Sequence, residues 1–390
     1  MKSNWKEERL GSLVRFSSGG TPNKNNPSYW NGTIPWISAK NMKSEVIETS
    51  DLSITEEGLI HGSKIAPKGS LLLLVRGSGL FNGIPVCYLE KAVAYNQDVK
   101  CIESTSELEN KYLFYWLKAN SGYLRKKIEF TSIGAGKFDT RFLSNLVVRF
   151  PDKVTRKKII DIADNISDRI NINRKINENL LQQLHQMYLH ILGTSDMDIL
   201  LGSVINTTSG GTPSRKHDEY YSDGSICWVK SKELLSGYIH DTEEHINELA
   251  VEKSSAKLLP THSVLIAMYG ATVGAYGIIA KPMTCNQAVC ALLSNEKYPY
   301  TYLFQLACES QQKLINLAVG SAQQNISQVL IKQLPIHQNF EAIHHFHSLA
   351  KPMHEEIESL QAENAKLAAI RDSLLPKLMS GELDVSALDL

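Results

Sequence analysis

The stretch Ser18-Gly-Gly-Thr-Pro22 decides the fold of this chain, because the same five residues return as Ser209-Gly-Gly-Thr-Pro213. The match continues along the chain at an offset of 190 to 193 residues, so that Trp36 corresponds to Trp228. A repeat of this period, half of the 390 residues, indicates that one structural unit is used twice. The sequence therefore predicts two similar domains and a function with two similar halves.

Length and composition limit the class of protein. A chain of 390 residues can form two domains with ordinary cores, and it contains no apolar stretch of 18 residues that could span a bilayer. Its six cysteines are scattered without a CxxC pair, which argues against a zinc ribbon and against a disulfide framework. The start of the chain is charged and lacks the apolar region of a signal peptide. We therefore expect a cytoplasmic protein.

Charge is unevenly distributed although the net charge is zero. Residues 1–151 contain 20 Lys and Arg against 14 Asp and Glu, whereas residues 196–337 contain 10 against 13. A neutral total weakly disfavours a protein that binds nucleic acid alone, because neutralised phosphates supply most non-specific affinity. It is compatible with a subunit whose partners add basic surface. Charge alone leaves DNA binding open.

The pattern of apolar residues predicts an α+β fold with four parts. Residues 1–151 and 196–337 have short apolar runs separated by Gly, Pro, Asn and Ser, typical of strands and loops, with helical spacing at 111–126 and 300–318. Residues 152–195 and 338–390 follow prolines and have long helical patterns. Gly193 is expected to end the first long helix, and Pro352 to kink the second or lie in its first turn.

Both helical patterns have apolar residues every seven positions. In the first, the series is Ile159, Ile166, Asn173, Leu180 and Met187, with Ile162, Ile170, Ile176, Leu184 and Ile191 as companions. In the second, it is Phe346, Met353, Leu360, Leu367 and Leu374, with Ala350, Ile357, Asn364, Arg371 and Leu378 as companions. This spacing predicts an antiparallel coiled coil, with Asn173 close to Asn364. The alternative is two amphipathic helices that each pack on their own domain.

Sequence signatures of catalysis are missing. The segment Gly134-Ala-Gly-Lys137 is followed by Phe138 and lacks the remaining residues of a P-loop. The tetrad of an amino-methyltransferase and the clustered carboxylates of a nuclease are also absent. His344, His345 and His347 have no acidic or cysteine partner nearby, so a solvated helix surface is favoured over a metal site. We expect no catalytic residue and no bound metal.

Polar residues of the kinds that contact DNA occur at matching places in the two halves. In the first half they are Thr21, Lys40, Asn41, Arg76, Ser78, Asn96, Gln97 and Lys137. In the second half they are Thr212, Lys230, Lys232, Tyr269, Thr272, Asn286, Gln287, Gln323 and Gln324. Arg and Lys pair with guanine edges or phosphates, and Asn and Gln with adenine. Each cluster taken alone also fits a structural role, and the Gly-Gly loop fits a shaped turn that uses backbone angles open to glycine.

Several longer motifs together resemble one known family. They are the two Ser-Gly-Gly-Thr-Pro loops, Met268-Tyr-Gly-Ala-Thr-Val-Gly274, Asn286-Gln287, Gly320-Ser-Ala-Gln-Gln-Asn-Ile-Ser327 and Leu374-Leu-Pro-Lys-Leu-Met-Ser-Gly-Glu-Leu383. In this combination, which covers essentially the whole chain, the sequence resembles the specificity subunits of type I restriction–modification systems. The first half departs from the second at Arg76-Gly-Ser-Gly-Leu80 and at Gly134-Ala-Gly-Lys137, where two domains that read different bases would need to differ.

The resemblance implies a non-catalytic subunit. Each recognition domain would read one half of a split, asymmetric site in the major groove of double-stranded DNA. The helices would set the unread gap and dock two methyltransferase subunits, and restriction/translocase subunits could join them. S-adenosylmethionine, ATP and magnesium would belong to those partners, with no cofactor on this chain. The competing hypotheses are a two-module protein–protein scaffold without DNA binding and an enzyme with an unrecognised site.

Overall fold

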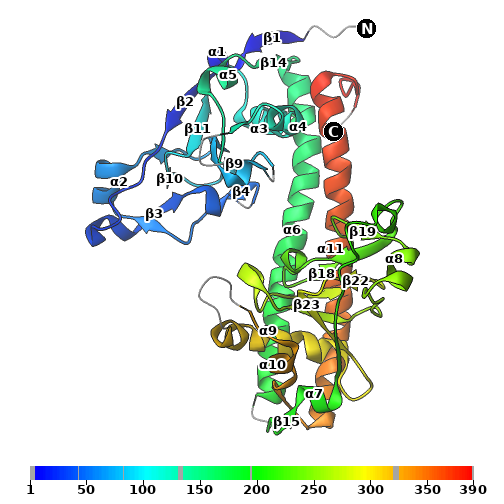
Figure 1. Ribbon diagram of the computed structural model, residues 1–390. Helices are drawn as coiled ribbons and strands as arrows, with labels where there is room; N and C mark the ends of the chain where they lie inside the picture. The colour runs from blue at the N-terminus through cyan, green and yellow to red at the C-terminus, as the bar shows by residue number, and fades with distance from the viewer. Residues whose placement is uncertain are drawn as a thin grey trace. The chain divides into compact units, whose positions relative to one another are not determined.

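The computed structural model describes residues 5–42, 44–81, 83–130, 135–193, 196–318 and 325–388. The chain divides into two compact units, a first unit of Met1–Arg169 with Leu367–Leu390 and a second unit of Ile170–Lys366. Each unit contains one globular domain and one part of each of two long helices (Figure 1). We call the globular part of the first unit the first domain and the globular part of the second unit the second domain.

A five-stranded sheet forms the centre of the first domain. Its strands lie in the order β2 (Val14–Ser18), β11 (Val99–Ser104), β7 (Leu71–Leu74), β9 (Val86–Leu89) and β4 (Val46–Ile47). Neighbours are antiparallel except β4 and β9, which are parallel. All four leucines of β7 are buried, as a short continuous apolar strand predicts. Helix α3 (Asn110–Ala119) adds Tyr112 and Phe114 to the same core.

The second domain repeats this topology strand for strand. The order is β16 (Asn206–Ser209), β23 (Val289–Leu293), β20 (Val264–Ala267), β21 (Tyr276–Ile279) and β18 (Tyr238–Ile239), again with only the last pair parallel. Helix α9 (Tyr300–Leu317) packs on it. The predicted pair of similar mixed α/β domains is therefore confirmed. The helical spacing at 111–126 corresponds to α3 and a separate α4 (Ser121–Arg125).

A smaller sheet accompanies each large one. In the first domain it is β5 (Ser53–Ile54), β3 (Trp30–Ile37), β10 (Val93–Tyr95) and β6 (Ile65–Ala66); in the second it is β19 (His245–Ile246), β17 (Ile226–Val229) and β22 (Thr284–Cys285). The start and end of each domain also pair, β1 (Lys6–Arg9) with β14 (Val147–Phe150) and β15 (Ile199–Leu200) with β24 (Pro335–Ile336). Short helices fill connections: α1 (Leu10–Leu13), η1 (Pro27–Tyr29), η2 (Ala39–Asn41), α2 (Glu56–Gly62), η3 (Ser78–Phe81), α5 (Thr140–Ser144), α7 (Leu201–Val204), η4 (Asp218–Tyr220), η5 (Ser231–Glu233), α8 (Glu248–Lys253), η6 (Gly270–Thr272) and α10 (Gln328–Lys332).

Two long helices follow the domains, α6 (Lys153–Leu192) and α11 (Phe340–Ser380). Asp152 caps α6, because its Oδ1 accepts from the backbone N–H of Val154 at 2.9 Å and of Thr155 at 3.1 Å. Gly193 follows the last residue of α6, as predicted. Pro352 lies well inside α11, so of its two predicted roles the place in the first turn is wrong, and the kink stays a prediction.

Contacts within the second unit run in opposite directions along the two helices. The ring of Tyr188 lies 5.7 Å from that of Phe346, and Asn173 Nδ2 donates to Asn364 Oδ1 at 3.0 Å. The position in α11 thus falls as the position in α6 rises, which is antiparallel packing. The predicted proximity of Asn173 and Asn364 is confirmed, and Asn173 also donates to Glu363 at 2.8 Å.

The seven-residue series mark the buried side of the helices with small shifts. Ile159, Asn173 and Leu360 are buried, whereas Ile166, Leu180, Met353, Asn364, Leu367 and Leu374 are half-buried. The expectation for Ile176 is wrong, because Ile176 is 37% exposed while its neighbour Asn177 is 6% exposed. Asn177 lies seven residues from both Ile170 and Leu184, which are buried, so the strict seven-residue spacing places Asn177 and not Ile176 on the buried side.

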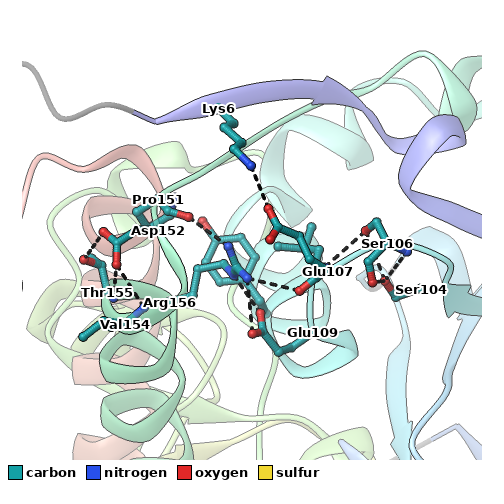
Figure 2. A network of polar contacts seen from close by, with 12 residues as sticks. Lys6, Ser104, Ser106, Glu107, Glu109, Pro151, Asp152, Val154, Thr155 and Arg156 are labelled. Atoms are coloured by element: carbon teal, nitrogen blue, oxygen red, sulfur yellow. Dashed lines mark hydrogen bonds and ion pairs between the residues drawn. The ribbon is translucent and has the colours of Figure 1, made fainter.

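Arg156 attaches the first turn of α6 to the first domain (Figure 2). Its side chain is 1% exposed, and its Nε donates to Glu109 Oε2 at 2.7 Å. The two terminal nitrogens donate to backbone carbonyls, Nη1 to Pro151 at 3.0 Å and Nη2 to Glu107 at 3.1 Å. A buried guanidinium with all these acceptors holds α6 in one orientation on its own domain.

The last part of α11 is attached to the first domain by a second ion cluster. Arg371 Nη1 lies 2.6 Å from Glu45 Oε1, and Lys118 contacts the same oxygen. Burial alone would raise the pKa of Glu45, but Lys118 and Arg371 outweigh it and lower that pKa. Burial of the Lys118 ammonium lowers the pKa of Lys118 despite its contact with Glu45.

Candidate nucleic-acid interface

The Ser-Gly-Gly-Thr-Pro loop of the first domain is fixed against its small sheet. Gly20 donates its N–H to the Tyr95 carbonyl at 2.9 Å, and the Trp36 indole donates to the Gly20 carbonyl at 3.0 Å. A Cβ added at Gly19 would lie only 1.9 Å from the Tyr95 oxygen. Neither glycine has a positive φ, so close approach of two backbones, and not an unusual angle, requires them.

The second domain builds the same loop with the same contacts. Gly211 donates to the Cys285 carbonyl at 2.9 Å, and Trp228 donates to the Gly211 carbonyl at 2.9 Å. A Cβ at Gly210 would lie 2.0 Å from the Cys285 oxygen. The expectation that these glycines serve unusual backbone angles is therefore wrong in both domains, and the loop is a shared frame.

The threonines of both loops are linked to the Asn-Gln pairs. Thr21 Oγ1 donates to Gln97 Oε1 at 2.7 Å, and Thr212 donates in the same way to Gln287. Both glutamines are exposed, so their amide groups remain next to solvent.

The asparagines that precede the glutamines have an internal role. Asn96 is 6% exposed, and its Oδ1 accepts from the Asp98 N–H at 3.2 Å. The half-buried Asn286 accepts from the Ala288 N–H at 3.2 Å. In this structure both asparagines brace the frame, whereas Gln97, Thr212 and Gln287 are exposed and Thr21 is half-buried.

Arg76 and Lys137 lie side by side in the first domain. Strands β8 (Arg76–Gly77) and β13 (Gly136–Lys137) are antiparallel, with Arg76 directly opposite Lys137, and β12 (Glu129–Phe130) completes a three-stranded ribbon. Both side chains are exposed, and among the described residues neither has a carboxylate partner. Gly77 has a φ of +135°, a value that favours glycine. The ribbon thus presents Arg76 and Lys137 on adjacent strands, with the exposed Glu129 of β12 opposite Lys137 on its other side.

The remaining candidates of the first domain lie in short helical turns. Lys40 is exposed on η2 and makes no ion pair with any residue that the structure describes. Asn41 caps that turn, since its Oδ1 accepts from the Ser38 N–H at 3.0 Å and from the Ser38 hydroxyl at 2.9 Å. Ser78 is exposed at the start of η3, directly after β8. Lys40 and Ser78 are accessible, whereas Asn41 shapes the turn.

The second domain neutralises its cations with its own carboxylates. Lys232 Nζ lies 2.5 Å from Glu243 Oε2, and Lys230 contacts Glu244. The hydrogen bond to Glu243 raises the pKa of Lys232, and the hydrogen bond from Lys230 lowers the pKa of Glu244. Arg215, which the sequence patterns did not indicate, also contacts Glu244.

Arg215 is also placed by an aromatic ring. Its guanidinium carbon lies 4.2 Å from the ring centre of Tyr221. Contacts within the second domain therefore neutralise and position three of its cations, Arg215, Lys230 and Lys232. The cations of the first domain differ in this respect.

Tyr269 takes the place in the second domain that Arg76 takes in the first. It is 40% exposed, and it forms an isolated antiparallel bridge with Asn325. Thr272 Oγ1 donates to the Tyr269 carbonyl at 3.1 Å, which makes a turn at Gly270, whose φ is +72°. Gln323 and Gln324 lie outside the described residues. An exposed tyrosine thus stands where the first domain has an arginine.

Long apolar helices are missing from the described part of the chain, in which no helix could cross a membrane.

Comparison with known proteins gives one consistent result. Residues 2–182 and 197–337 match the family described as Type I restriction modification DNA specificity domain. The MjaIX specificity subunit of a type I restriction enzyme from Methanocaldococcus jannaschii is 25% identical over 426 residues, which cover 99% of this chain and 95% of that protein. The EcoR124I/EcoR124II specificity subunit of Escherichia coli is 30% identical over 162 residues, which cover 41% of this chain and 40% of that protein.

A solved structure has the same fold. The S subunit of a type I restriction–modification system from M. genitalium matches with a TM-score of 0.54 at 18% identity, and the match covers 97% of this chain and 96% of that one. The family match spans most of both domains, and the repeated frame with variable polar loops agrees with it. The chain belongs to the family of non-catalytic DNA specificity subunits of type I restriction–modification systems.

Proposed function

We propose that each domain reads one half of a bipartite, asymmetric sequence in the major groove of double-stranded DNA. The observation that carries this proposal is the contrast between a shared frame and different loops. Both domains fix the same Gly-Gly loop through a tryptophan, but one presents Arg76 beside Lys137 and the other presents Tyr269. Arginine suits guanine O6 and N7, whereas a tyrosine ring and hydroxyl make different contacts.

The two long helices act as a spacer in this proposal. Residues 152–195 and 338–390 form an antiparallel coiled coil that sets the unread gap between the half-sites. Support comes from the antiparallel contacts in the second unit and from Arg156, which holds the start of α6 on the first domain. The domain limits 1–151 and 196–337 belong to the same proposal.

The partners follow from the family. We propose that two methyltransferase subunits dock on the helices, that restriction/translocase subunits join them, and that the complex works in the cytoplasm. S-adenosylmethionine, ATP and magnesium then belong to those subunits. The scaffold alternative, with two protein-binding modules and no DNA, is not favoured by a family of DNA specificity subunits.

Exchange of one domain tests the proposal. Residues 1–151 are replaced by the corresponding domain of a relative, and the complex with methyltransferase subunits is used to select duplexes from a random library. We expect one half-site to change while the other half and the gap stay the same. Changes in both halves refute one domain for one half-site. Failure of the unmodified complex to select any duplex supports the scaffold.

Insertion of one helical turn tests the spacer. About four residues are added to the middle of α6, and the same selection is repeated. We expect the preferred gap to change while both half-site sequences are kept. An unchanged gap contradicts the spacer and leaves the reading of the half-sites standing.

A further inference from the structure

Three metal-ligating side chains meet in the second domain at a place that no part of the proposed function uses. They are Cys227 in β17, Asp241 in the loop after β18, and His245 in β19. Their possible ligand atoms, Sγ, a carboxylate oxygen and a ring nitrogen, all lie within 4.8 Å of one another. The Cys227 Sγ–Asp241 Oδ1 distance is 3.3 Å, and the His245 Nε2–Asp241 Oδ1 distance is 2.7 Å.

The backbone holds this arrangement in place. Cys227 and His245 are directly opposite each other in the antiparallel pair of β17 and β19. The chain between them is fixed at Thr242, whose Oγ1 accepts from the Trp228 N–H at 3.1 Å. The ligand positions are therefore set by strand pairing and by a short braced loop.

The shared frame does not require these residues. The first domain has the same strand pairing, but Pro35 lies opposite Ser53 where the second domain has Cys227 opposite His245. Counted from the paired strands, Thr49 stands at the place of Asp241. Neither proline nor the two hydroxyl residues offer a thiolate, an imidazole or a carboxylate. The shared frame forms in the first domain without these three residues, so the fold alone does not explain their presence in the second domain.

We propose that Cys227, Asp241 and His245 bind a zinc-class divalent cation. Thiolate and imidazole ligands select zinc and similar transition metals over magnesium and calcium. Tetrahedral zinc with bonds of about 2.0 to 2.3 Å places its ligand atoms about 3.3 to 3.7 Å apart. The Sγ–Oδ1 distance fits this geometry, and the Nε2–Oδ1 distance has to open by roughly half an ångström.

Access to the site is open on one side. Cys227 is 1% exposed, but the side chains of Asp241 and His245 are 71% and 31% exposed. The cation can thus enter from solvent, and water takes the fourth position. On binding, the Cys227 thiol becomes a thiolate and its proton passes to the buffer, so one proton leaves for each metal bound at neutral pH.

The site lies in the loop 241–245, whose carboxylates contact two cations proposed to contact DNA. Glu243 and Glu244, between Asp241 and His245, hold Lys232 and Lys230. A metal would stiffen this loop and the positions of both lysines. This consequence rests on the proposed DNA function, whereas metal binding itself does not.

Cobalt titration of the full chain without DNA tests the site. Cobalt(II) replaces zinc and gives a thiolate-to-metal charge-transfer band in the near ultraviolet. We expect a band that saturates at one cobalt per chain, is removed by one equivalent of zinc, and is lost in Cys227→Ser and in His245→Gln. His217→Gln is the matched control, because His217 and Glu219 form an exposed imidazole–carboxylate pair at 2.8 Å within the same domain.

Thermal unfolding supplies a second readout that does not depend on cobalt. Zinc should raise the Tm of the unaltered chain and of His217→Gln, and should leave the Tm of His245→Gln unchanged. If Cys227→Ser does not fold, the half-buried His245 still allows the test. A chain that shows no band at micromolar cobalt, or a band that persists in His245→Gln, overturns the proposal. DNA selection is measured separately, so failure here leaves the proposed function intact.

Discussion

The unpaired cations of the first domain should control the salt dependence of DNA binding. Arg76 and Lys137 lie opposite each other on an exposed ribbon and have no carboxylate partner among the described residues. A cation that neutralises a phosphate contributes about 0.9 to the slope of log K against log salt. We expect Lys137→Ala to reduce this slope by about 0.9, and the double variant with Arg76→Ala by up to about 1.8 if both contact phosphates.

Lys232 in the second domain should behave differently. Its ammonium is already 2.5 Å from Glu243, so binding to DNA exchanges one anion for another and releases fewer counterions. We expect Lys232→Ala to change the slope by well under 0.9. Lys68→Ala is the control for Lys232→Ala: Lys68 also has a carboxylate partner, Glu90 at 3.8 Å, but lies at the opposite end of β7 from Arg76, so its removal should leave the slope unchanged.

Fluorescence anisotropy of a labelled duplex measures these slopes. The chain is assembled with methyltransferase subunits and titrated at several salt concentrations. An unchanged slope in the Arg76 and Lys137 double variant refutes the assignment of the ribbon to DNA. If Lys232→Ala changes the slope by the same amount, the internal carboxylates do not reduce the contribution of the second domain's cations to DNA binding.

Three further predictions concern the helices and their attachment. Arg156→Met should lower the free energy of unfolding of the first unit by about 3 kcal/mol, because buried carbonyls and part of Glu109 lose their partner. Denaturant curves followed by tryptophan fluorescence measure this loss, since four of the five tryptophans lie in residues 1–151. A loss below about 1 kcal/mol contradicts the prediction. Asn173→Leu combined with Asn364→Leu should keep the helical circular dichroism but give disulfide crosslinks between the two helices in more than one register. Crosslinks in a single unchanged register contradict this prediction. The pKa of Glu45 is lowered in the folded chain, so the ionised carboxylate stabilises the fold fully above the ordinary pKa of a glutamate. This stabilisation is lost as pH falls through the lowered pKa. Glu45→Gln should therefore flatten the acid side of the curve of stability against pH, and an unaltered curve argues against this prediction.

The architecture could be predicted from the sequence, because the internal repeat and the helices are marked by strong local patterns. A tryptophan and a Gly-Gly loop at a constant offset pointed to one frame built twice, and heptad spacing pointed to α6 and α11. The companion series, whose spacing drifts from seven, placed Ile176 on the buried side, where the structure has Asn177. The error came from preferring an apolar residue to the seven-residue count, because a polar Asn at a buried helix position cannot be recognised by its residue type.

The candidate interface was less predictable, because its properties depend on contacts between distant residues. The sequence indicated Lys232 as a cation free to contact DNA, whereas in the fold Glu243 lies next to it. Asn96 read as a base-contacting amide, yet it braces its own loop. Cys227 read as one scattered cysteine, because strand pairing, and not spacing along the chain, brings His245 opposite. Residue type indicated which groups can contact DNA, while only the fold showed which of them are already engaged.

The pairing of each domain's first strand with its last has a consequence for how such chains can change. Lys6–Arg9 pair with Val147–Phe150, so the two ends of the first domain lie about 5 Å apart across a pair of strands. The second domain closes in the same way, through Ile199–Leu200 and Pro335–Ile336. Each domain therefore enters and leaves the rest of the chain at one place, where its first and last strands pair. Recombination within these short strands could therefore exchange a whole domain, but an incoming first domain would have to supply new partners for Arg156 of α6 and Arg371 of α11.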